Sequence, residues 1–130
     1  KYLVRLFLPA AWLIAVGWLS LTPSPPQVHG IMGWDKLLHA GAYGLLTILM
    51  AQYFLHYLQN PWHAGWLAVL CAVVCGGGLE ILQMAMQSGR TAEWTDLFAD
   101  AIGAILGCVI FRQIVVLYWR YFEYSESSHG

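Results

Sequence analysis

"GGGLEILQMAMQSGR", residues 76–90, combines two properties that rarely occur together in one stretch of sequence. It continues an apolar run long enough to cross a bilayer, yet it carries a carboxylate, Glu80, and an amide, Gln83, one turn later. A charge at the centre of a bilayer costs about 2.5–3.5 kcal/mol even on translocon-insertion scales. We therefore expect Glu80 to line an interior polar site rather than to face lipid.

The composition of the whole chain indicates an integral membrane protein. Of its 130 residues, 59% are hydrophobic and 10% are charged, whereas a soluble domain carries about 25% charged residues. The formal net charge of −1 leaves no basic stripe to neutralise phosphates, so nucleic acid is not an expected partner. The three cysteines lie inside apolar runs, where a free cysteine usually behaves as a small hydrophobic residue.

Four stretches are apolar enough, at about 20 residues each, to cross a bilayer as helices. They are residues 3–21, 37–58, 64–87 and 97–119. Because the first apolar run exceeds the ~7–15 residues of a signal-peptide core, we expect a retained anchor there. The sequence predicts an all-α, integral membrane four-helix bundle over residues 1–122, followed by a polar tail over residues 123–130.

The distribution of basic residues predicts how the bundle is oriented. Four of them lie near the two ends of the chain: Lys1, Arg5, Arg112 and Arg120. The connections contain only Lys36 and Arg90. Since basic flanks tend to remain cytoplasmic, we predict that both termini are cytoplasmic and that connections 22–36 and 88–96 share the outer face.

Polar residues recur at helical spacing on one face of each of the last three spans. These stripes are Asp35, His39 and Tyr43; Gly76, Glu80, Gln83 and Gln87; and Asp96, Asp100, Gly103 and Gly107. All three stripes fall in the predicted outer half of the bilayer, and the G-x-x-x-G spacing in the last allows close helix approach. We expect the stripes to meet around a small, outward-facing hydrated recess, with Arg90, Lys36, His39 or a proton balancing Glu80.

Four motifs carry a resemblance to a known family. They are "SLTP" (20–23), "DKLLHAGAYGLL" (35–46), "GGGLEILQ" (76–83) and "SGRTAEWTDLFADAIGAILG" (88–107). In this order they resemble the VanZ-like family of small bacterial membrane proteins, with the pattern D-K-x-x-H, E-x-x-Q, R and D-x-x-x-[ND]-x-x-G-x-x-x-G. Asp100 stands where the family more often has asparagine, which makes this site more acidic.

The resemblance implies a multi-pass protein of the bacterial inner (cytoplasmic) membrane, with a role in the cell envelope or in teicoplanin-type antibiotic resistance. It also implies which polar residues matter. By matching motif positions these are Asp35, Lys36, His39, Glu80, Gln83, Arg90, Asp96 and Asp100. The recess, to which Tyr43 adds a ligand-binding candidate, is expected to bind a lipid head group, a lipid-linked wall precursor or a lipophilic antibiotic, with the tails between helices.

Three alternatives remain open on the sequence. A membrane-embedded hydrolase or transferase would use His39 with Glu80 or Asp100 as general base and acid. The histidine and carboxylate spacing is far weaker than H-E-x-x-H, so neither a metal nor another cofactor is predicted. An accessory subunit of a larger membrane complex would instead use its outer surface, with Phe111 and the aromatic run 118–122. In a purely structural alternative, the aspartates only stabilise the starts of helices, where the helix dipole is positive. Glu80 and Arg90 would then form an ion pair that holds the third helix to the connection after it.

Overall fold

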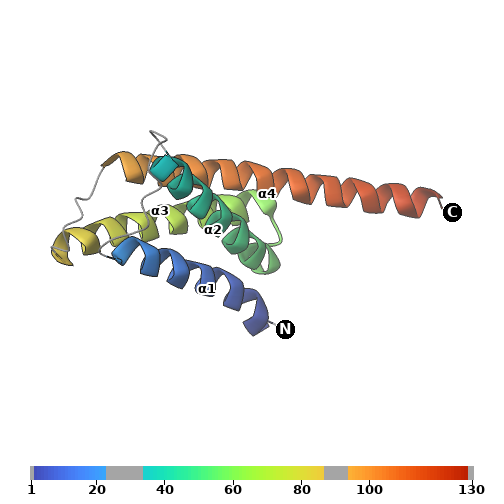
Figure 1. Ribbon diagram of the computed structural model, residues 1–130. Helices are drawn as coiled ribbons and strands as arrows, with labels where there is room; N and C mark the ends of the chain where they lie inside the picture. The colour runs from blue at the N-terminus through green and yellow to red at the C-terminus, as the bar shows by residue number, and fades with distance from the viewer. Residues whose placement is uncertain (1, 23–33, 87–93, 129–130) are drawn as a thin grey trace.

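The structure is a computed structural model, and it describes residues 2–22, 34–86 and 94–128, with side chains for 6–22, 35–86 and 94–121. The regular structure in these ranges is entirely helical (Figure 1). The helices are α1 (Tyr2–Leu21), α2 (Trp34–Leu58), α3 (Pro61–Met86) and α4 (Trp94–Ser128). Three are long and apolar enough to span a membrane, over Asp35–Leu58, Pro61–Met86 and Trp94–Tyr121, and α1 adds a shorter apolar stretch, Leu6–Leu21. The predicted all-α fold with four helices is confirmed.

Most helix ends lie within three residues of the predicted spans, but α4 is much longer than expected. It contains 35 residues, so the predicted polar tail, 123–130, begins inside this helix. At 1.5 Å per residue α4 is roughly 52 Å long, compared with about 30 Å for a hydrocarbon core. Figure 1 shows the C-terminal part of α4 extending beyond the other helices.

A two-residue turn, Gln59 and Asn60, joins α2 to α3. Gln59 has a φ of 50°, the left-handed conformation that commonly ends a helix. Asn60 caps α3, because its Oδ1 accepts hydrogen bonds from the backbone nitrogens of Trp62 (2.9 Å) and His63 (3.3 Å). Pro61 occupies the first helical position, where its missing N–H is not needed. The tight turn makes α2 and α3 antiparallel neighbours.

Helices α2, α3 and α4 form the centre of the bundle, and α1 lies beside it. Among the described residues, α1 contacts α2 and α3 but not α4. The start of α1 and the end of α4 lie at the same end of the bundle (Figure 1). The first turns of α2 and α4 lie at the other end. This arrangement agrees with four crossings, while the cytoplasmic location of the termini stays a prediction.

Small residues let α2 and α4 approach each other closely. A Cβ added to Gly103 would overlap the backbone of Ala40, and one added to Gly107 would overlap the carbonyl oxygen of Gly44. Only glycine therefore fits at these two positions without moving a helix. The close approach predicted from the G-x-x-x-G spacing is confirmed.

The apolar core lies between α2, α3 and α4, with Val16 of α1 packed against it, and it includes a residue that the sequence placed outside. Phe111 is 2% exposed and packs with Ala51, Ala64 and Ala68, whose small side chains leave room for its ring. Its proposed place on the outer surface of an accessory subunit is therefore wrong. Other aromatic residues further along α4, such as Trp119, are exposed.

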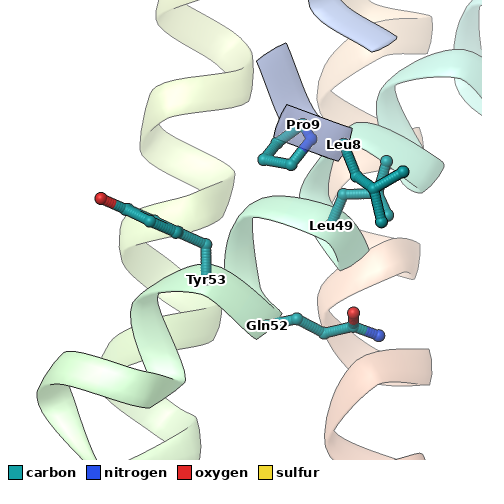
Figure 2. Close-up of a pocket in the computed structure, with 5 residues that line it drawn as sticks. All are labelled: Leu8, Pro9, Leu49, Gln52 and Tyr53. Atoms are coloured by element: carbon teal, nitrogen blue, oxygen red, sulfur yellow. The ribbon is translucent and has the colours of Figure 1, made fainter. Parts of the chain in front are cut away.

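A hydrogen bond joins helix α1 to α2. Trp12 Nε1 donates a hydrogen bond to the Ala42 carbonyl oxygen of α2 at 2.9 Å. Towards the start of α1, a hollow of about 310 Å³ separates the two helices. It is lined by Leu8, Pro9, Leu49, Gln52 and Tyr53 (Figure 2). The hollow contains none of the residues predicted to form the site.

Candidate functional site

The first two turns of α2 and of α4 place ionisable side chains in direct contact. Lys36 Nζ lies 2.9 Å from Thr95 Oγ1 and 3.3 Å from Asp96 Oδ1. His39 Nδ1 lies 2.9 Å from Asp100 Oδ1, and its Nε2 lies 3.9 Å from Asp96 Oδ2. These contacts form because each pair, 36 with 39 and 96 with 100, is separated by one helical turn. We call Asp35, Lys36, His39, Asp96 and Asp100 the polar cluster.

The polar cluster opens gradually from a buried base to an exposed rim. Asp100 is 1% exposed, and the side chains of Asp96 and His39 are 11% and 14% exposed. The Lys36 side chain is 44% exposed, and Asp35 is also exposed. A ligand that arrives from this end of the bundle therefore meets Lys36 and Asp35 first and His39 and Asp96 next.

Asp100 fixes the orientation of the His39 ring. An ionised carboxylate can only accept a hydrogen bond, so a bond to Asp100 requires the hydrogen on Nδ1. In the neutral ring this leaves the lone pair on Nε2, which faces Asp96. A carboxylate holds histidine in this way both in general bases and in metal ligands.

Helix α3 closes the base of the cluster. A Cβ added to Gly76 would lie 3.0 Å from Asp100 Oδ2 and 3.1 Å from Tyr43 Cε1, so a larger residue would press on both. Tyr43 is 2% exposed, which places it behind the cluster. Glu80, one turn after Gly76, is half-buried, its Oε2 is shielded from solvent, and it lies within electrostatic range of Tyr43.

The remaining predicted site residues lie elsewhere. Gln83 is buried, but its Nε2 donates a hydrogen bond to the Ser20 carbonyl oxygen of α1 at 2.7 Å, so this contact joins two helices. Gln87 and Arg90 lie outside the described residues. Thr95, which receives a hydrogen bond from Lys36, was not among the predicted site residues.

The cluster carries more negative than positive charge. Three carboxylates surround His39, and Lys36 is the one fixed cation among its five members. Asp35, His39 and Asp96 can each offer one ligand atom, and these atoms lie within 4.8 Å of one another. The arrangement can accept hydrogen bonds from a polar ligand, hold a cation, or use His39 to transfer a proton.

Comparison with known proteins identifies the family. No solved structure matches the chain. The model of the VanZ/LLP1 family matches residues 5–118, which include most of α1, all of α2 and α3, and the polar cluster. The match covers most of the 130 residues, and it agrees with the resemblance of the four motifs. The chain therefore belongs to the VanZ/LLP1 family.

Proposed function

We propose that this membrane protein works in the bacterial cell envelope by binding the polar head group of an amphiphile at the polar cluster. One observation carries the proposal. In a chain with only 10% charged residues, five ionisable side chains from α2 and α4 lie together at one end of the bundle. Ionisable residues within membrane helices are costly to insert and usually serve a function.

The charges of the cluster indicate what kind of head group it favours. Asp35 and Asp96 offer carboxylate oxygens near the rim, and Lys36 offers one ammonium group. Amines, amides and sugar hydroxyls donate hydrogen bonds to carboxylates, whereas an isolated phosphate is repelled by them. The cluster therefore favours a head group that carries donors, with Lys36 available for one anionic group.

Three kinds of amphiphile combine such donors with an apolar tail. They are an aminophospholipid, a lipid-linked cell-wall precursor and a lipophilic, teicoplanin-type antibiotic. The family membership supports an envelope ligand. The tail of any of them would lie along the apolar outer faces of the helices, where many leucine, isoleucine and valine side chains are exposed.

Native mass spectrometry of the protein purified from bacterial membranes in a mild detergent tests the proposal. We expect a bound amphiphile on the wild-type protein and at least a tenfold lower occupancy for Lys36→Gln and for Asp96→Asn. Arg120→Gln is the matched control, because Arg120 is an exposed cation far along α4 from the cluster. Added phosphatidylethanolamine and phosphatidylglycerol serve as defined probes, and the first should bind more strongly.

The proposal is wrong if Lys36→Gln and Asp96→Asn, both folded, keep the occupancy of the wild type. It is also wrong if Arg120→Gln loses the amphiphile to the same extent. The mass of the bound species separates the three kinds of ligand.

The His39–Asp100 pair favours one second candidate, a hydrolase or transferase that acts on the bound amphiphile. Its 2.9 Å contact orients His39 as a general base would be oriented. If the protein catalyses such a reaction, the wild type should release a product whose mass differs from that of the bound amphiphile. His39→Gln should retain the unchanged amphiphile, and identical released species from both proteins would exclude catalysis by His39.

A further inference from the structure

The polar cluster also has the composition and geometry of a metal site. We propose that Asp35, His39 and Asp96 bind one divalent transition-metal ion, Zn²⁺ in preference to Mn²⁺, and that Asp100 is a positioning residue for His39. This inference goes beyond amphiphile binding and does not depend on it, because metal binding can be measured on the protein alone.

The three ligand atoms lie close enough to converge on one ion. All are within 4.8 Å of one another, and His39 Nε2 is 3.9 Å from Asp96 Oδ2. Zinc bonds to nitrogen and oxygen are about 2.0–2.2 Å long, which places the ligands of a tetrahedral ion about 3.3 Å apart. Rotation of the exposed Asp35 side chain can shorten the distances that involve Asp35.

The His39 ring is already oriented for coordination. Its Nδ1 bonds to Asp100, and with Asp100 ionised the lone pair of the neutral ring is on Nε2, which faces Asp96. A carboxylate behind a histidine, on the side away from the metal, is the usual outer arrangement of zinc and related sites. Favourable helix dipoles explain acids in the first turns of α2 and α4, but they do not explain a histidine held between those acids.

The donor set decides the kind of ion. One imidazole nitrogen with two carboxylate oxygens suits Zn²⁺ and Mn²⁺ better than Mg²⁺ or Ca²⁺, which prefer oxygen ligands alone. Lys36 contacts Asp96 through Oδ1, so Oδ2 is directed to the His39 side. Three protein ligands leave at least one coordination position for water or for an anionic group of an amphiphile.

Titration of the chelator-treated, untagged protein in detergent with ZnCl₂ tests the site, with MnCl₂ and MgCl₂ as comparisons. Isothermal calorimetry and elemental analysis should give one Zn²⁺ per chain, weaker Mn²⁺ binding and the weakest for Mg²⁺. Asp35→Asn and His39→Gln should each weaken Zn²⁺ binding at least tenfold. His63→Gln, which changes a histidine at the start of α3, is the matched control and should bind as the wild type does.

Asp100 is tested separately, because it acts through His39. Asp100→Leu should weaken Zn²⁺ binding by about 10–100-fold, the usual effect of losing an outer-shell partner. Asp100→Asn retains an oxygen acceptor for Nδ1, so it should bind more tightly than Asp100→Leu. With Co²⁺ as a probe, the visible spectrum should change in Asp100→Leu even at full occupancy.

Two results would overturn the metal site. One is wild-type protein that is folded, by circular dichroism, but binds no Zn²⁺. The other is Zn²⁺ affinity that is unchanged in folded Asp35→Asn. Asp35 is exposed, so its substitution should leave folding intact even if His39→Gln unfolds the bundle. Equal affinity of Asp100→Leu and wild type would remove the positioning role alone.

Discussion

Gln83 and His39 are both polar residues inside membrane-spanning helices, but they form hydrogen bonds to different helices. Gln83 donates to a carbonyl oxygen of the last turn of α1, which an apolar residue could not do. His39 bonds across to Asp100 of α4 and keeps its second nitrogen facing Asp96. At the scale of single residues, one amide joins helices, whereas the imidazole is held in a position where it can meet a ligand.

We therefore expect Gln83→Leu to weaken the attachment of α1 without affecting the polar cluster. Hydrogen bonds between membrane helices contribute about 0.6 kcal/mol on average and up to about 1.7 kcal/mol. Unfolding by SDS in mixed micelles should show a loss in this range. Gln113→Leu, on an exposed face of α4, is the control and should change stability by less. Equal stability of the two variants, or loss of the bound amphiphile in Gln83→Leu, would contradict this assignment.

At the scale of helices, the seam between α2 and α4 decides whether the cluster can form. Gly103 and Gly107 lie against the backbone of Ala40 and Gly44, one to two turns from His39 and Asp100. The seam brings the first two turns of each helix close enough for side chains to bond directly. The spacing of these glycines was visible in the sequence, but the partner helix was not, because apolar residues surround several other glycines too.

Substitution of Gly103 by alanine should therefore destabilise the bundle. The added methyl group would overlap the Ala40 backbone, and such overpacking typically costs about 1–3 kcal/mol. Gly78→Ala is the matched control, since a Cβ there meets nothing within 4 Å and alanine has the higher helix propensity. Unfolding in mixed micelles should separate the two, and a Gly103→Ala variant as stable as Gly78→Ala would show that the helices are not in contact there.

At the scale of the whole molecule, the start of α1 and the end of α4 lie at one end of the bundle, and the starts of α2 and α4, which carry the polar cluster, lie at the other. The basic residues near the termini predict that the termini are cytoplasmic, so the cluster should face outward. The cluster would then meet the outer leaflet, where envelope precursors and antibiotics are encountered.

Orientation can be measured by labelling single cysteines in a variant without Cys71, Cys75 and Cys108. A membrane-impermeant maleimide added to intact spheroplasts should label Ser24→Cys and leave Ser128→Cys unlabelled. Disrupted spheroplasts, in which both should react, provide the control. Labelling of Ser128→Cys alone in intact spheroplasts would mean the opposite orientation.

Much of this organisation was predictable from the sequence. The lengths of the apolar stretches predicted the helices. The cost of burying charge in a membrane indicated that residues such as Asp35, His39 and Asp96 meet. The sequence could not choose between Glu80 and Asp100 as the partner of His39, or direct Gln83 to α1, because these contacts depend on which helices are neighbours and on their rotation. Similarly, Phe111 reads as one more lipid-facing residue until the small side chains opposite it are known.

The central claim is that polar side chains of α2 and α4 meet in the membrane, and a double-mutant cycle on His39 and Asp100 tests it most directly. Free energies of unfolding would be measured for the wild type, His39→Ala, Asp100→Ala and the double variant, with His63→Ala and Asp100→Ala as the control cycle. Residues in contact show coupling of roughly 0.5–3 kcal/mol, whereas distant residues add within about 0.3–0.5 kcal/mol. We predict coupling in the first range for His39 with Asp100 and additivity for His63 with Asp100. Additivity in both cycles would contradict the account.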